Sequence, residues 1–332
     1  MFIMKKTIFF LGIIFFPLVI AGCATSVPVT VTRPAELDLH GAKSISILPF
    51  QLSSSHNKEN NRSETTAIIN FLNFFDALQS DDPDEISTAN YLTSGLMQKL
   101  SDSRYIQVVD SSSVQRALEN GTPVPTDVYL TGRISRFDSD ITSSERTERQ
   151  NDKECKATYY TRIVAAAITY QIVDAKTNRV VAYKTKDLRA TSREFRNPRA
   201  LEKPFDIIRP DLDRLLTQIM KEIQPYSERK YISLISDKTK DPDMKTANKL
   251  VKEGFIVQSR ERFMSLYKTK GYFEAGYNAG KLLQAEGKLQ EAEEMMSELV
   301  NKFGNSQAVS GLSDIKYEID QAEILKGQSA TR

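Results

Sequence analysis

The chain has 332 residues, of which 40% are hydrophobic and 27% are charged, a length that favours two folded domains. Its 45 Lys and Arg residues nearly balance its 43 Asp and Glu residues, so no overall basic field is present and a nucleic-acid-binding protein is excluded. Its two histidines, His40 and His56, and its two cysteines are too few for a credible zinc site, and we expect neither metal nor cofactor.

The first 22 residues have the order of features found in a secretory signal. Lys5 and Lys6 provide the positive start, and an apolar stretch follows from Ile8 to Ala21. A membrane-spanning helix needs about 20 apolar residues, so this stretch is too short to cross a bilayer comfortably. Residues 1–22 are therefore predicted to be a signal peptide.

The signal ends at Ile20-Ala21-Gly22-Cys23, which resembles a bacterial lipobox. This resemblance implies that Cys23 receives a diacylglycerol and becomes the N-terminal residue after cleavage. Fatty acids on Cys23 would then hold the protein in a membrane, because two or three chains anchor stably where one does not. Ala24 does not resemble the aspartate of inner-membrane retention signals, so the expected location is the periplasmic side of the outer membrane.

Removal of the signal also removes Lys5 and Lys6, which leaves 43 basic and 43 acidic residues in a formally neutral protein. Cys155 is the only other cysteine, so a lipidated Cys23 leaves it without a disulfide partner in its own chain. The role of Cys155 stays open.

Residues 23–42 read as an extended tether, and residues 43–226 as an α/β (α+β) domain. Apolar and β-branched runs predict strands, and amphipathic stretches predict helices that cover the resulting mixed sheet. The expected strands are 44–50, 105–110, 127–139, 158–174 and 180–190. The expected helices are 66–78, 87–100, 112–119 and 205–223, with Ser111 or Ser112 as the cap of the third.

The C-terminal part is predicted to be an all-α domain of helical repeats over residues 241–326, after a linker at 227–240 and before a disordered tail at 327–332. Shifted by 33 residues, the chain matches itself: Ala247 falls on Gly280, and Phe263 on Met296. Glu253-Gly254 falls on Glu286-Gly287, where a glycine can end a helix. The second copy resembles a tetratricopeptide repeat.

The order of four segments in the first domain resembles the CsgG-like domain of curli-secretion lipoproteins and penicillin-binding-protein activators. These segments are ISILPF, YIQVVDSSSVQRAL, VYLTGRISRFDSDI and RIVAAAITYQIVDAKTNRVV. The family has a Thr-Gly at the strand-turn-strand of the last segment, where this chain has Thr177-Asn178. Asn tolerates a left-handed backbone almost as well as Gly, so the turn is expected to survive.

The resemblance also implies a channel, because the curli protein inserts β-hairpins into a membrane, one of them where this chain has Asp140 to Lys156. This segment carries Glu145, Arg146, Glu148 and Arg149 among other charges. A lipid-facing strand must alternate apolar residues, and Arg or Lys at the bilayer midplane costs about 2–4 kcal/mol each. We therefore predict a solvated hairpin or loop here.

The chain shows no catalytic motif, and we predict a non-catalytic scaffold or adaptor in cell-envelope assembly, with a subunit of a curli-type secretion channel as the alternative. The expected partner is an envelope protein or peptide held in the groove of the repeats. A homo-oligomer is left open. The predicted groove residues are Lys245, Asn248, Lys252, Asn278, Lys281 and Gln284. A second candidate surface is the phenylalanine-rich helix from Ile68 to Leu78.

Overall fold

The computed structural model describes residues 25–52, 82–150 and 153–330. Cys23, His56 and the predicted helix from Ile68 to Leu78 lie outside these ranges. The chain divides into two compact units, which are described separately. One, the sheet unit, comprises residues 32–228 and 321–330; the other, the repeat unit, comprises residues 25–31 and 229–320.

The sheet unit contains a five-stranded sheet of order β3-β2-β4-β5-β6, in which β2 is parallel to both neighbours and the other pairs are antiparallel. A mixed sheet with flanking helices is the predicted fold class. The strands are β2 (Ser44–Ile47), β3 (Gln107–Val108), β4 (Val128–Gln150), β5 (Lys153–Asp174) and β6 (Val180–Thr191). The helices are α2 (Pro83–Ser101), α3 (Ser111–Asn120) and α4 (Pro204–Ile223), with a short 3-10 turn, η3, at Pro198–Ala200.

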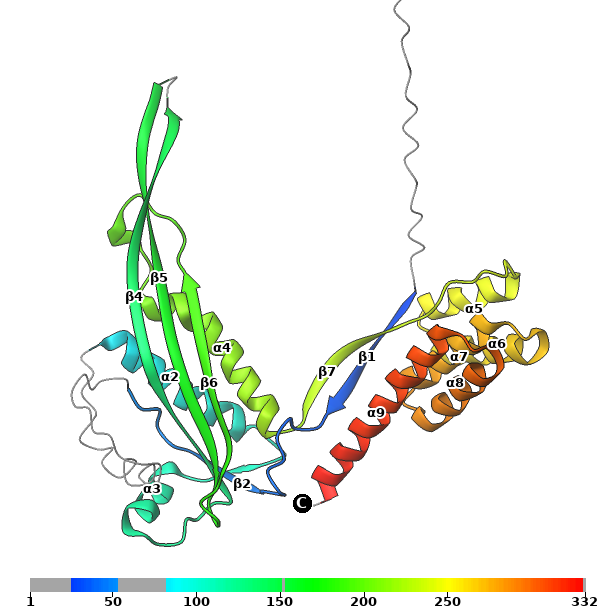
Figure 1. Cartoon of the computed structure of the whole chain (residues 1–332), viewed down its shortest axis with the longest axis horizontal. Helices are drawn as coiled ribbons and strands as arrows, with labels where there is room; N and C mark the ends of the chain where they lie inside the picture. The colour runs from blue at the N-terminus through cyan, green and yellow to red at the C-terminus, as the bar shows by residue number, and fades with distance from the viewer. Residues whose placement is uncertain (1–24, 53–81, 151–152, 331–332) are drawn as a thin grey trace, which may run out of the picture. The chain divides into compact units, whose positions relative to one another are not determined.

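One face of the sheet packs against α2 and α4 (Figure 1). Every second residue of β5 from Val164 to Ile172 is buried in this core, because side chains alternate between the two faces of a strand. Leu212 and Leu216 of α4 and Leu92 of α2 fill the space above them. The amphipathic pattern that predicted these helices therefore corresponds to a real buried face.

The start of helix α3 differs from the sequence-based expectation, and the turn between β5 and β6 agrees with it. Helix α3 begins after Asp110, whose carboxylate accepts a hydrogen bond from the Ser113 N–H at 3.0 Å, so the predicted serine cap is wrong. The turn between β5 and β6 is confirmed: Asn178 has φ 54°, and the Asp174 carboxylate accepts from the Lys176 and Thr177 N–H groups.

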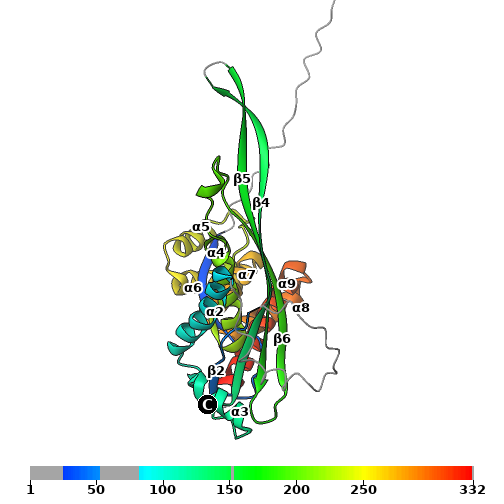
Figure 2. The same cartoon turned by 90° about the vertical axis from the view of Figure 1, so that its left-hand side faces the viewer.

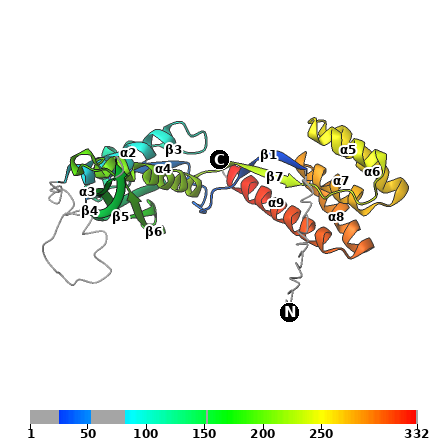
Figure 3. The same ribbon diagram turned by 90° about the horizontal axis from the view of Figure 1, so that it is seen from above.

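Residues 242–320 of the repeat unit form two successive helix-turn-helix pairs and most of a following helix, and this confirms the predicted C-terminal run of helices (Figure 3). The helices are α5 (Pro242–Lys252), α6 (Ile256–Lys270), α7 (Phe273–Ala285), α8 (Leu289–Phe303) and α9 (Ser306–Ala330). Gly254 and Gly287 occupy equivalent turns with φ 85° and 77°, a left-handed backbone that glycine adopts without strain. The paired positions Phe263 and Met296 are both fully buried.

Three predicted segments at the borders are corrected. Strand β1 (Ser26–Arg33) lies in the predicted tether and pairs with β7 (Tyr226–Ser233), which lies in the predicted linker. Arg33 Nε is 2.7 Å from Glu228 Oε2. The tail from residue 327 is not disordered as far as Ala330, because α9 continues to that residue. Within the described ranges, no helix is both long and apolar enough to cross a membrane.

Candidate functional site

Asn278, one of the predicted groove residues, is fully buried and holds the backbone of the chain's own Ile235. Its Oδ1 accepts a hydrogen bond from the Ile235 N–H at 2.9 Å, and its Nδ2 donates to the Ile235 carbonyl at 3.0 Å. Helix α7 presents this amide toward the segment after β7, and the neighbouring Leu234 is also buried. Both hydrogen-bonding groups of the side chain are therefore used inside the repeat unit.

Lys281 and Gln284 lie one and two turns along the same face of α7, and both contact Asp314 of α9. The Lys281 Nζ lies 2.7 Å and the Gln284 Nε2 3.0 Å from Asp314 Oδ2, while Lys230 Nζ lies 2.7 Å from Oδ1. Burial raises the pKa of the Asp314 carboxyl, but the hydrogen bonds from these three side chains outweigh burial and hold the pKa below its ordinary value. The charge of Asp314 is thus compensated by its neighbours, whereas the buried Oε1 of Gln284 has no hydrogen-bond partner among the described residues.

The structure thus contradicts the expectation that Asn278, Lys281 and Gln284 are exposed in an open groove. Their first-copy counterparts on α5 differ: Lys245 and Lys252 are exposed, and Asn248 is half-buried with its amide bonded to the Met244 carbonyl. The repeat period correctly places all six residues on the first helices of the pairs. It gives no information about distant segments of the chain, and those segments cover the second copy.

A buried polar network in the sheet unit was not predicted from the sequence. The Glu222 side chain of α4 is fully buried; it accepts a hydrogen bond from the Tyr170 hydroxyl at 2.9 Å and pairs with Lys184 Nζ at 2.8 Å. Burial, followed by the hydrogen bond to Glu222, raises the pKa of Tyr170. Because the carboxylate is fully satisfied by these partners, the network has a structural role and offers no free group for chemistry.

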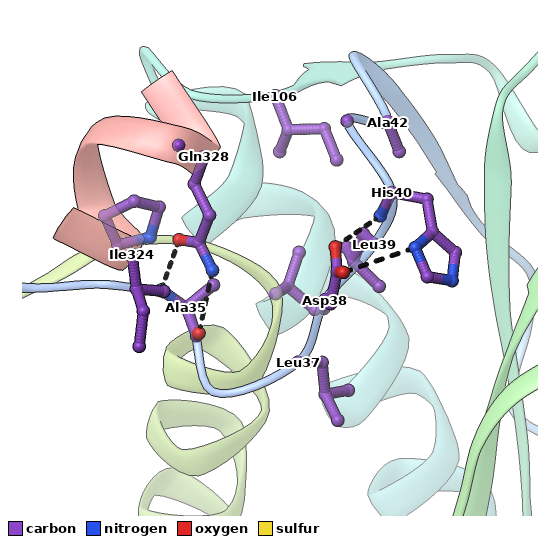
Figure 4. A pocket seen from close by; sticks show the side chains of 13 residues that line it. Ala35, Leu37, Asp38, Leu39, His40, Ala42, Ile106, Ile324 and Gln328 are labelled. Atoms are coloured by element: carbon purple, nitrogen blue, oxygen red, sulfur yellow. Dashed lines mark hydrogen bonds and ion pairs between the residues drawn. The ribbon is translucent and has the colours of Figure 1, made fainter. Parts of the chain in front are cut away.

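An apolar pocket of about 410 Å³ lies between the segment after β1 and the end of α9 (Figure 4). Leu37, Leu39 and Ile324 line it, and Gln328 closes it by holding both backbone groups of Ala35, at 2.8 and 3.1 Å. The one acid–histidine contact drawn there, between Asp38 and His40, is more than two-thirds exposed on both side chains. An ion pair this exposed is screened by solvent and salt.

Strands β4 and β5 extend beyond the end of β6 as a two-stranded hairpin (Figure 2). We call the paired residues 141–150 and 153–162 the arm, and the predicted hairpin at Asp140 to Lys156 is confirmed within it. The alternation of a strand puts Arg146 and Glu148 on one face, and Glu145 and Arg149 on the other. Charges therefore lie on both faces of the arm.

The segment after β6 contacts one face of the arm. Arg146 pairs with Glu194 at 2.6 Å, and Arg196 pairs with Glu148 and lies against the Tyr159 ring. On the other face, Lys156 lies 3.9 Å from Glu145. These contacts order the arm without an apolar core. Cys155 is exposed and lies opposite Glu148 in the register of β4 and β5, so both side chains are on the same face of the arm.

No protein-family model matches this chain, and no curated protein matches its sequence. Among solved structures, the chain is similar to the PelC dodecamer from Paraburkholderia phytofirmans, with 10% identity and a TM-score of 0.27, over 60% of this chain and 99% of that one. It is also similar to lipoprotein GNA1162 from Neisseria meningitidis, with 10% identity, a TM-score of 0.26, and coverage of 53% and 96%. The chain is likewise similar to the hypothetical protein CT253 from Chlamydia trachomatis, with 9% identity and a TM-score of 0.28, over 54% of this chain and 95% of that one. At these values the likeness carries no argument about function.

Proposed function

We propose that this protein is a non-catalytic, lipid-anchored scaffold of the bacterial cell envelope that contacts a protein partner through the arm. The arm carries the proposal. A two-stranded hairpin in water is marginally stable at best, and none of the described side chains of the arm belongs to a buried core cluster. A structured extension that contributes so little to folding is best explained by contact with something outside the chain.

The charges of the arm indicate what that partner is. Opposite charges occur on each face, with Arg146 and Glu148 on one and Glu145 and Arg149 on the other. Such a surface is suited to a hydrated protein partner with its own mixed charges. The same pattern disfavours the alternative, a curli-type channel subunit, because a barrel strand needs one apolar face toward lipid.

The arm can be removed at a defined point, because Asp140 and Ile163 lie directly opposite each other. Joining them by Asn-Gly, which favours a two-residue hairpin turn, replaces residues 141–162. We expect circular dichroism and thermal unfolding to show a folded protein. Photocrosslinking in intact cells, with the photoreactive residue placed on β6 near the base of the arm, should lose its partner band.

A second variant, which keeps the arm folded, separates the loss of a specific contact from the general effect of removing the arm. Exchanging the charges of one cross-strand pair, Glu145→Lys with Lys156→Glu, keeps their attraction and the net charge but alters the pattern that a partner meets. We expect a weaker crosslink from an arm that is still folded. An unchanged partner band in the deletion variant would refute the arm as the contact surface, and discrete conductance steps in planar bilayers would favour the channel.

The anchor is tested separately by Cys23→Ser. We expect the variant to be released into the soluble fraction or to remain unprocessed, as measured by fractionation and intact mass. Normal processed mass together with membrane retention would show that Cys23 carries no lipid.

A further inference from the structure

A second pocket lies on the opposite face of the sheet from α2 and α4. Its floor is formed by β4 and β5, where Tyr129 pairs with Val173 and Thr131 with Gln171, so all four side chains point to one face. Helix α3 and the loop after it form one wall, and the turn before β6 forms another. The cavity measures about 700 Å³, within the range of sites that hold small molecules.

Two hydroxyl groups on this floor have no hydrogen-bond partner among the described residues. Tyr129 is 8% exposed and Thr131 is 5% exposed, yet within the described ranges neither side chain makes a hydrogen bond. Neither hydroxyl oxygen is among the described side-chain atoms that are buried without a partner, so both oxygens reach open space and are available to something that enters the pocket. Burial alone raises the pKa of Tyr129, which keeps its phenol protonated and able to donate.

Tyr170 provides the contrast on the other face of the same sheet. It is also a buried strand tyrosine, at 1% exposure, but its hydroxyl donates to Glu222 at 2.9 Å. The core side of the sheet therefore satisfies its tyrosine internally, while the pocket side leaves its tyrosine open to the cavity.

Apart from Lys176, the rest of the lining is apolar or uncharged. Leu118, Val124 and Val180 contribute aliphatic side chains. Lys176 is the only charged residue of the lining, and its Nζ lies 3.0 Å from Asp127 Oδ1. An anion would have to compete with Asp127 for this ammonium group, and a cation would meet no carboxylate in the lining.

We propose that this pocket binds a small uncharged amphiphile, with its apolar body against the aliphatic wall and a hydroxyl or amide group bonded to Tyr129 and Thr131. Neutral donors and acceptors on the floor match a neutral polar group, which can replace water without the desolvation cost of a charge. This site is independent of the arm and of the proposed scaffold role.

The test uses hexyl β-glucoside as an uncharged probe and hexyl sulfate as a matched anionic probe with the same chain. The full chain is titrated with each and followed by NMR of methyl groups that line the cavity, such as those of Val124 and Val173. We expect saturable shifts with the glucoside and weaker binding of the sulfate. Equal binding of both probes, stronger binding of the sulfate, or no saturable binding of the glucoside would overturn the proposal.

Two variants test the floor without changing its volume. Tyr129→Phe and Thr131→Val should each weaken glucoside binding by about three- to tenfold, the loss of one hydrogen bond. Neither should lower the melting temperature of the unliganded protein, because no internal hydrogen bond is lost. Tyr170→Phe is the matched control: it should lower the melting temperature and leave binding unchanged. A fall in stability with Tyr129→Phe equal to that with Tyr170→Phe, or unaltered affinity in both pocket variants, would refute the assignment.

Discussion

Asp127 joins three parts of the sheet unit and gives the sharpest prediction about stability. Its Oδ2 accepts hydrogen bonds from the Lys43 N–H, the Ser44 N–H and the Ser44 hydroxyl, at 3.0, 3.1 and 2.9 Å. Its Oδ1 lies 3.0 Å from Lys176 Nζ. The carboxylate therefore links the start of β2 to the start of β4 and to the turn before β6.

These contacts set the pKa of Asp127. Partial burial raises it, but the hydrogen bonds from Lys176, Lys43 and Ser44 outweigh burial and lower it from 3.8 to about 2. One pKa unit corresponds to about 1.4 kcal/mol, and because 28% of the side chain remains exposed we reduce the total for solvent screening to about 1–2 kcal/mol. Since the folded-state pKa is depressed, this stability is present above pH 3.8 and is lost as the pH falls through 2.

Asp127→Asn removes the titration. We expect the variant to be less stable than the parent at pH 5 and the difference to shrink by about 1–2 kcal/mol by pH 2, leaving only the pH-independent cost of a poorer acceptor. Hydrogen exchange of peptides from β2 and β4, corrected for the intrinsic rate at each pH, reports the sheet unit alone. Asp138→Asn, an exposed control on β4, should change stability by less than about 0.5 kcal/mol. A parent–variant difference that is constant from pH 5 to pH 2 would refute this account of Asp127.

Two further predictions concern buried polar groups. Asn278→Ala leaves both backbone groups of Ile235 without their partner and should destabilise the repeat unit by about 1–3 kcal/mol in urea unfolding; an unchanged midpoint would show that water replaces the amide without cost. Lys184→Met leaves the buried Glu222 carboxylate without its cation and should cost about 3–5 kcal/mol, and adding Glu222→Gln should recover part of this loss. If the double variant is no more stable than the single one, charge burial is not the cause.

Local patterns predicted the elements of the sheet unit because local physics determines them. Helix α4 was expected at 205–223 and is found at Pro204–Ile223, since its apolar stripe is the face that covers the sheet. The hairpin turn was expected at Thr177-Asn178 because few residues accept the left-handed backbone seen at Asn178. The charge density of residues 140–156 likewise predicted that the hairpin is solvated.

Contacts between distant parts of the sequence could not be predicted from such patterns. The pairing of β1 with β7 joins segments that a local reading takes for a tether and a linker, and the Arg33–Glu228 contact spans 195 residues. In the repeat unit, the polar side chains on the first helix of each pair are expected to face solvent because they are polar. Whether Asn278 faces water or Ile235 depends on where another part of the chain lies, and the 33-residue period contains no information about that.

The contact between Gln328 and Ala35 also constrains when the sheet unit can be completed. The two residues are separated by 293 positions, so during synthesis from the N- to the C-terminus Ala35 emerges long before Gln328. Until then the apolar side chains of Leu37, Leu39 and Ile106 lack the cover that Ile324 and Gln328 later provide. A chain halted before residue 321 would therefore leave an apolar surface exposed next to otherwise finished strands, and such a surface favours aggregation. The sheet unit is therefore complete only after the last helix has formed.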